Sequence, residues 1–199
     1  MNNTYNGGLT REKFLFFETR TIASLIKQGM TRDEIVKTIH DENLFQFPTE
    51  RMIDRFATTC FRRIDSLDSE ELVCQLADAP ISDAKQINLY AMMKDNRIVW
   101  DFMTGVIGEK YRTQAFDFSR KDLNVFFFQL QEQDDDVASW SDTTIAKIKQ
   151  VLTRCLVECS YLDSRKDTQL NAITIAPVLE AAIYTKNDVA ALPAFNCFK

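Results

Sequence analysis

Residues 141–160 read SDTTIAKIKQVLTRCLVECS, and this stretch decides how the chain is interpreted. Ser141 is a residue type that commonly caps the start of a helix, and no proline or glycine follows before Ser160. At about 100° per residue, the apolar side chains gather on one side of this helix. They are Ile145, Ile148, Leu152, Cys155, Leu156 and Cys159. The stretch therefore predicts a long amphipathic helix with one buried face.

The opposite side of this helix carries polar side chains that suit nucleic acid. The row comprises Thr143, Lys147, Gln150 and Arg154, flanked by Thr144 and Lys149. Hydroxyl, ammonium, amide and guanidinium groups all donate hydrogen bonds to phosphates and base edges. Ser141 and the free backbone N–H groups of the first turn add a phosphate site. Any amphipathic helix has a polar face, however, so a merely solvated surface is the alternative.

The elements around this helix favour a winged helix-turn-helix. Before it, Ser119-Arg120-Lys121-Asp122 predicts a capped helix that carries three consecutive phenylalanines, and an acidic connector over 133–136 follows. After it, Ile173-Thr174-Ile175 alternates like a strand and predicts a small β-hairpin. In this fold the long helix enters the major groove. Arg165 and Lys166 would then form the tip of the wing and contact phosphate.

The residues before this unit predict a bundle of helices, which makes the chain mainly α. The expected helices run from Thr10 to Gly29, from the capping box Thr31-Glu34 to about Asn43, from Glu50 onward, over 69–77, over 82–94, and from about Asn96 with a bend at Gly105 or Gly108. A last helix is expected from Pro177 to Tyr184. With a boundary placed within 112–119, the prediction is an N-terminal helical domain over 1–115 and a C-terminal winged-helix-like domain over 116–199.

A second basic set lies in the N-terminal part. Arg11 and Lys13 belong to the first expected helix, and Arg62 and Arg63 belong to the third. These four side chains are candidates for a further phosphate-binding surface. Acidic residues are interspersed among them, so a solvated face with weak ion pairs is the alternative.

The net charge of −5 argues against a nucleic-acid partner only as an average. Counted by segment, residues 66–140 hold seven basic and fourteen acidic residues, which gives −7, while 1–65 and 141–199 each carry +1. Both ends of the chain can therefore present basic faces. The acidic middle part is expected to face away from DNA.

Catalysis and metal binding have little support in the sequence. There is no glycine-rich phosphate loop, GxSxG elbow or HExxH motif, and His40, the single histidine, has no nearby cysteine. Asp134-Asp135-Asp136 is expected to be a solvated turn, and the five cysteines form no CxxC pair. We expect no enzyme activity, cofactor, metal or small-molecule substrate. With no signal peptide and no apolar run of membrane-spanning length, a soluble cytoplasmic protein is expected.

Two stretches together resemble a known family. The first runs from Gly8-Leu9-Thr10-Arg11-Glu12 through Gly29-Met30-Thr31 and Glu42-Asn43-Leu44 to Phe61-Arg62-Arg63-Ile64, and the second runs from Trp140-Ser141-Asp142 through Lys147 to Tyr161-Leu162-Asp163. In this order the chain resembles BrxA, the small accessory protein of BREX phage-resistance systems. The resemblance implies a mostly helical protein that acts beside a methyltransferase and other BREX components. It also implies DNA binding, and the family has been likened to NusB-type RNA-binding proteins.

The combined expectation is a non-enzymatic accessory protein that binds double-stranded DNA in phage defence. One alternative is a protein–protein adaptor that docks other BREX proteins through the acidic middle part. The other is NusB-like RNA binding.

Overall fold

The computed structural model describes residues 4–198, and within them the chain is mainly helical. The helices of the first half are α1 (Phe16–Lys27), α2 (Arg32–Asp41), α3 (Glu50–Leu67), α4 (Glu70–Asp78), α5 (Ile81–Asp95) and α6 (Arg97–Asp101). Those of the second half are α7 (Gly108–Arg112), α8 (Arg120–Gln133), α9 (Asp135–Ala138), α10 (Asp142–Glu158) and α11 (Pro177–Thr185). Two 3₁₀ helices, η1 (Gly7–Thr10) and η3 (Val189–Phe195), and a π-helix, η2 (Phe102–Ile107), complete the fold.

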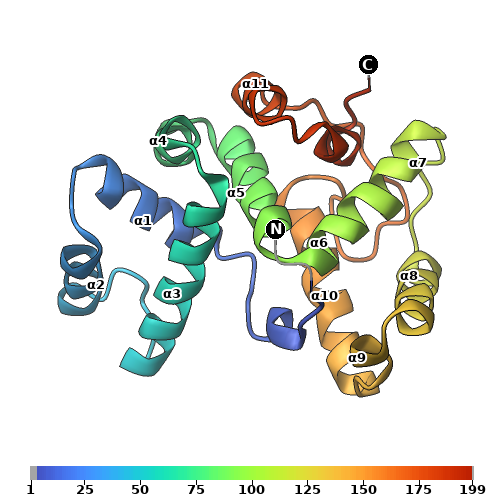
Figure 1. The fold of residues 1–199 in the computed structure, drawn as a ribbon, viewed down its shortest axis with the longest axis horizontal. Coiled ribbons are helices and arrows are strands. Elements are labelled where there is room, and N and C mark those ends of the chain that lie inside the picture. The colour runs from blue at the N-terminus through green and yellow to red at the C-terminus, as the bar shows by residue number, and fades with distance from the viewer. Residues whose placement is uncertain (1–3, 199) are drawn as a thin grey trace.

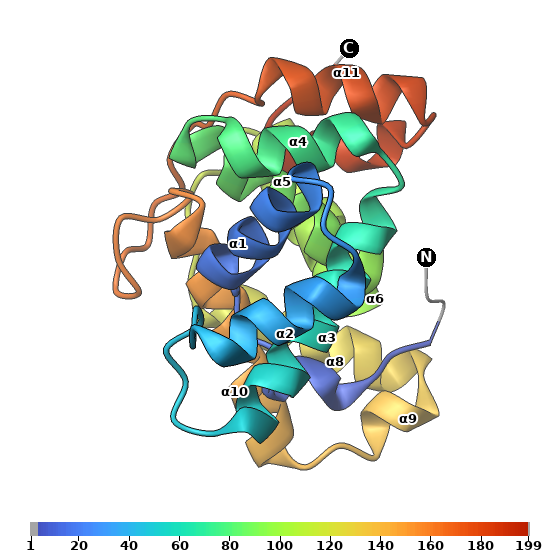
Figure 2. The ribbon, with the colours of Figure 1, turned by 90° about the vertical axis from the view of Figure 1, so that its left-hand side faces the viewer.

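Helix α5 occupies the centre of the fold. It packs against α1, α3, α4 and α6, and nearly all of its middle residues are buried. Figures 1 and 2 show α4 and α11 at one end of the molecule and α9 and α10 at the other. The buried apolar side chains form one connected cluster from Leu9 to Phe195. The domain boundary predicted within 112–119 falls between α7 and α8, and it stays a prediction.

The capping signals in the sequence correctly located three helix starts. Thr31 accepts from the backbone N–H of Glu34, whose carboxylate accepts from the Thr31 N–H, so α2 opens with the expected capping box. Ser119 caps α8, and Ser141 caps α10. Within α8 two of the three consecutive phenylalanines are buried, whereas Phe128 is 61% exposed.

The first helix begins later than predicted. Thr10 ends the 3₁₀ helix η1, with its hydroxyl donating to the Gly7 carbonyl, and α1 starts only at Phe16. The carbonyl of Lys13 accepts from Arg63, and that of Phe14 accepts from both Arg63 and Asn88. A helix through these residues would need the same carbonyls for its own bonds. Side chains from α3 and α5 therefore keep the segment before α1 out of a helix.

The predicted hairpin at 170–176 is wrong. Residues 4–198 contain no β-strand, only an isolated antiparallel bridge between Asp117 and Gln169. The Gln86 side chain donates to the Thr174 carbonyl and accepts from the Ala176 N–H, both at 2.9 Å. Side chains thus satisfy the backbone groups that a hairpin would have paired with each other.

A glycine allows the π-helix region to contact the C-terminal part closely. A Cβ added at Gly108 would lie 2.8 Å from the Pro193 Cβ and 3.1 Å from the Pro193 carbonyl carbon.

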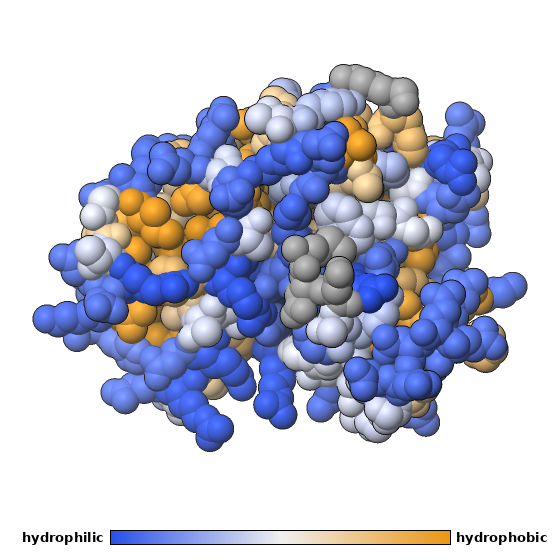
Figure 3. Space-filling model, in the orientation of Figure 1, coloured by the Kyte–Doolittle hydropathy of each residue, from blue (hydrophilic) through white to orange (hydrophobic). Residues whose placement is uncertain are grey.

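Figure 3 shows that the surface facing the viewer is mostly hydrophilic, with hydrophobic residues gathered over α1. Within residues 4–198, no helix combines the length and apolar character needed to cross a membrane.

Candidate nucleic-acid interface

Helix α10 has the orientation that its sequence pattern predicts. All six predicted apolar residues are buried, including Ile148, Leu152 and Leu156 with no more than traces of exposed surface. Ser141 accepts from the Thr144 backbone N–H at 3.3 Å, which fixes the start of the helix. The opposite side of α10 is therefore presented to solvent.

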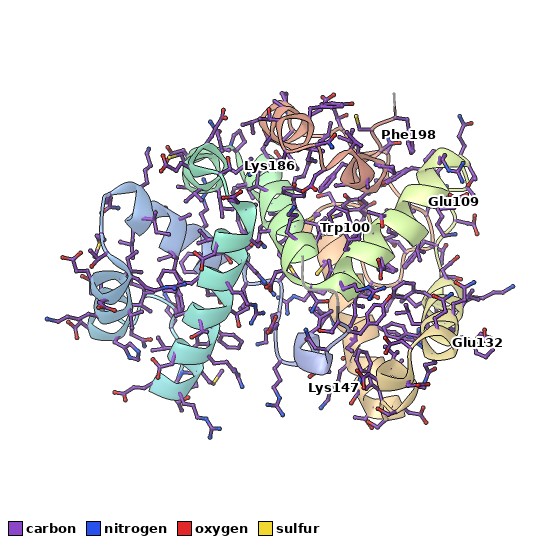
Figure 4. The ribbon with its side chains drawn as sticks, viewed as in Figure 1. Trp100, Glu109, Glu132, Lys147, Lys186 and Phe198 are labelled. Atoms are coloured by element: carbon purple, nitrogen blue, oxygen red, sulfur yellow. The ribbon has the colours of Figure 1, made fainter. Side chains whose placement is uncertain are left out.

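The predicted polar row is exposed, but its members differ in their partners. Thr143, Lys147, Gln150 and Arg154 are all exposed. Within residues 4–198, Lys147 forms no ion pair, and Figure 4 shows it on the lower part of α10 in this view. Arg154 lies 3.5 Å from the Glu158 carboxylate one turn later, an exposed pair that holds its charge weakly.

A groove of about 940 Å³ lies beside this row. Its walls are the start of α8, the middle of α10 and the loop 162–168. Arg120, Lys149, Arg165 and Lys166 contribute four positive charges, and Asp167 contributes the single negative charge of the lining. Three segments that are distant in sequence thus bring their cations to one place. Three of these residues were predicted, whereas Arg120 was not.

The loop that carries Arg165 and Lys166 is held by hydrogen bonds. The Ser164 hydroxyl donates to Asp167 at 3.0 Å and accepts from the Lys166 N–H at 3.2 Å. After the loop, the Leu170 N–H donates to the Phe116 carbonyl at 2.7 Å. These contacts leave both basic side chains exposed and without an ion pair among the described residues. The loop therefore presents two cations at a fixed place on the surface.

Lys149 is the most constrained cation of the groove. Its ammonium donates to the Asn124 side-chain oxygen at 2.8 Å and lies 5.3 Å from the centre of the Phe127 ring. Burial lowers the pKa of Lys149, because the charged form loses part of its hydration. The side chain is therefore positioned before any ligand arrives.

The N-terminal set divides into two pairs. Arg11 and Lys13 are exposed, and η1 packs on the start of α10, with a Cβ added at Gly7 lying 3.7 Å from Thr144 Cγ2. Arg11 and Lys13 thus follow a segment that borders the polar row.

The second pair is committed to contacts within the protein. Arg62 binds both Asp95 oxygens, at 2.6 and 2.9 Å, and also Glu12 at 2.7 Å. The hydrogen bonds to Asp95 and Glu12 raise the pKa of Arg62. Arg63 is 1% exposed and binds the carbonyls before α1. Neither guanidinium is available in this structure for a phosphate.

The candidates for metal binding have ordinary roles. Among the described residues, no group of three or more His, Cys, Asp and Glu side chains could hold a metal ion. Asp134 caps the short helix α9 by accepting from the Val137 N–H, and His40 contacts Asp54 at 2.7 Å. Cys60, Cys155 and Cys159 are buried, and burial raises the pKa of each thiol.

Sequence reasoning missed Arg120 because it belongs to the segment with net charge −7. The first turn of a helix is usually favourable for acidic residues, so a basic residue directly after the Ser119 cap was a signal. Its proximity to Lys149, however, depends on how α8 packs beside α10.

Comparisons with known proteins agree on one family. The profile of the BrxA family matches residues 3–187. A Bacillus cereus protein named BREX protein BrxA is 33% identical over 81% of this chain and 80% of its own length. An Escherichia coli protein of the same name is 25% identical, covering 83% of this chain and 78% of its own length. A crystal structure of an uncharacterized Magnetospirillum magneticum protein has the same fold, with a TM-score of 0.80 and 23% identity over 96% of this chain and 97% of that one. The chain belongs to the BrxA family.

Proposed function

We propose that this BrxA-family chain is a non-enzymatic accessory component of a BREX phage-defence system and binds double-stranded DNA. The observation that carries the proposal is the basic groove, where Arg120, Lys149, Arg165 and Lys166 converge from three segments. Phosphates supply most of the affinity of protein–DNA contacts through such cations. Within residues 4–198, none of these four cations is neutralised by an ion pair.

The proposed docking places α10 in the major groove, which is wide enough for one α-helix. The exposed row on α10 then faces the base edges, and the adjacent groove receives a phosphate strand. In this proposal the loop 162–168 takes the role of a wing, supported by the bridge between Gln169, directly after the loop, and Asp117 before α8. Arg11 and Lys13 extend the surface beyond the start of α10. Arg62 and Arg63 are not part of the proposed interface, because their guanidinium groups already bind carboxylates and backbone carbonyls inside the protein.

The electrostatics predict modest affinity that falls steeply with salt. Each phosphate contact adds about 0.9 to the slope of log affinity against log salt. Losing the contacts of Arg165 and Lys166 should therefore lower the slope by about 1.8. When the salt is raised from 50 to 200 mM, the affinity of wild type should therefore fall by a factor about 12 times larger than the affinity of a variant that lacks these two contacts.

The experiment compares two double variants that change the net charge equally. Arg165→Glu/Lys166→Glu reverses the loop, and Lys37→Glu/Arg51→Glu reverses two exposed cations on α2 and α3, which lie on the opposite side of the molecule from α8. Fluorescence anisotropy with a 20-base-pair duplex, titrated at several salt concentrations, gives both affinity and slope. We expect the loop variant to bind DNA more weakly and with a smaller salt slope, whereas the affinity and slope of the control should stay near those of wild type. Equal losses in the two variants would contradict a localised interface.

A duplex RNA of the same length distinguishes the remaining functions. Tighter binding of RNA than DNA would favour the NusB-like alternative. No binding of either nucleic acid at low salt would overturn the proposal and favour a protein–protein adaptor.

A further inference from the structure

Most polar side chains around the proposed interface already have partners inside the protein. The Thr153 hydroxyl donates to the Lys149 carbonyl at 2.9 Å, and the Asn124 oxygen accepts from the Lys149 ammonium. Ser141 and Thr144 hydrogen-bond to each other at 3.1 Å. Groups that are used in this way are not free to read a base.

Gln150 is different. Within residues 4–198 its side-chain amide makes no hydrogen bond, and the residue is exposed. It belongs both to the polar row and to the lining of the groove. One turn away on either side along the row lie Lys147 and Arg154, so cations on both sides can fix the position of the DNA around this amide.

The chemistry of an amide selects a base. A primary amide has a donor and an acceptor side by side, and adenine presents the matching pair, N6–H and N7, in the major groove. The free hydroxyl of Thr143 has no such fixed pair, because one rotating O–H serves as both donor and acceptor.

We propose that Gln150 is a specificity-determining residue that binds one adenine in the major groove, an inference that rests on the proposed DNA binding. The polar row from Thr143 to Arg154 spans eleven residue steps of α10, or about 17 Å at 1.5 Å per residue. This length corresponds to about five base pairs. The preference therefore appears as one adenine within a window of about five base pairs.

A selection from random duplex DNA tests the inference. The whole protein is incubated with a pool that carries 14 random base pairs, and the bound fraction is sequenced. We expect the wild type to enrich adenine at one position and Gln150→Ala to lose the enrichment. On the selected duplex, changing that adenine should weaken wild-type binding by about 5- to 150-fold, the range for one bidentate base contact.

Gln129→Ala is the matched control. Gln129 is an exposed glutamine on α8, outside the groove lining, and within residues 4–198 its side chain makes no hydrogen bond. The Gln129→Ala variant should therefore enrich the same adenine as wild type. The salt slope of Gln150→Ala on unselected DNA should match wild type, since the amide carries no charge.

The outcomes separate the two proposals. Salt-dependent binding without an enriched adenine, or an enrichment that Gln150→Ala retains, would overturn the inference and leave DNA binding intact. If no duplex is retained from the pool at low salt, DNA binding itself is overturned.

Discussion

Replacing Arg63 with alanine tests whether this arginine holds the N-terminal segment. Its two terminal nitrogens donate to the carbonyls of Phe14 and Lys13, both at 3.0 Å, from a side chain that is 1% exposed. A hydrogen bond with a charged donor contributes about 1.5–3 kcal/mol, and the variant loses two and leaves a cavity. Relief from burying the guanidinium offsets part of this, so the free energy of unfolding should fall by about 3–5 kcal/mol. For a chain of this size, the midpoint of thermal unfolding should drop by roughly 6–20 °C.

The neighbouring arginine provides the control. Arg62 is 48% exposed, but its partners Asp95 and Glu12 are only 6% and 14% exposed, so Arg62→Ala should cost about 1–3 kcal/mol, which is still less than Arg63→Ala. Thermal and urea unfolding of both variants, followed by circular dichroism, measure the difference. If Arg63→Ala is destabilised by no more than Arg62→Ala, the assignment of Arg63 to the core is refuted.

Three further predictions concern stability and reactivity. Gly108→Ala should lower the free energy of unfolding by about 1–3 kcal/mol in urea melts, because the added methyl overlaps the segment packed against it. Burial raises the pKa of Asp188, but the hydrogen bonds from Lys94 and Tyr90 and the nearby lysine charges together outweigh this and hold the pKa below its usual value. The ionised Asp188 therefore stabilises the fold above about pH 4, and this stabilisation is lost as the pH falls through the lowered pKa. In urea melts from pH 3 to 7, the free energy of unfolding of Asp188→Asn should fall less on acidification than that of wild type. Iodoacetamide at pH 8 should label exposed Cys74 before Cys155, because burial raises the pKa of Cys155 to about 12. Mass spectrometry of the peptides measures both rates, and equal labelling of the two cysteines would contradict the prediction.

Local signals in the sequence predicted much of the helical architecture. The caps at Thr31, Ser119 and Ser141 work through hydrogen bonds that span three residues, so the sequence contains all their partners. The buried face of α10 was equally predictable, because it follows from helical period alone.

The incorrect predictions share one physical cause, which is a distant side chain that binds the backbone. The hairpin at 170–176 is replaced by contacts to Gln86, about ninety positions away. The early start predicted for α1 is prevented by Arg63 and Asn88. The sequence around Thr10 and Ile173 contains no sign of these distant partners. It therefore shows the pattern of a helix start at Thr10 and of a strand at Ile173, although neither element forms there.

The same principle explains why counting charges gave only part of the interface. Arg62 and Arg63 are adjacent and basic, yet one is neutralised by Asp95 and Glu12 and the other is buried. Arg165 and Lys166 are also adjacent and basic, and the acid beside them, Asp167, is occupied in holding the loop through Ser164. A cation attracts phosphate strongly only if no carboxylate already satisfies it. Which carboxylate pairs with which cation depends on the tertiary structure and cannot be counted from the sequence. The cations that no carboxylate pairs with therefore locate the candidate interface. Arg120 is one of them, although it belongs to the acidic segment 66–140.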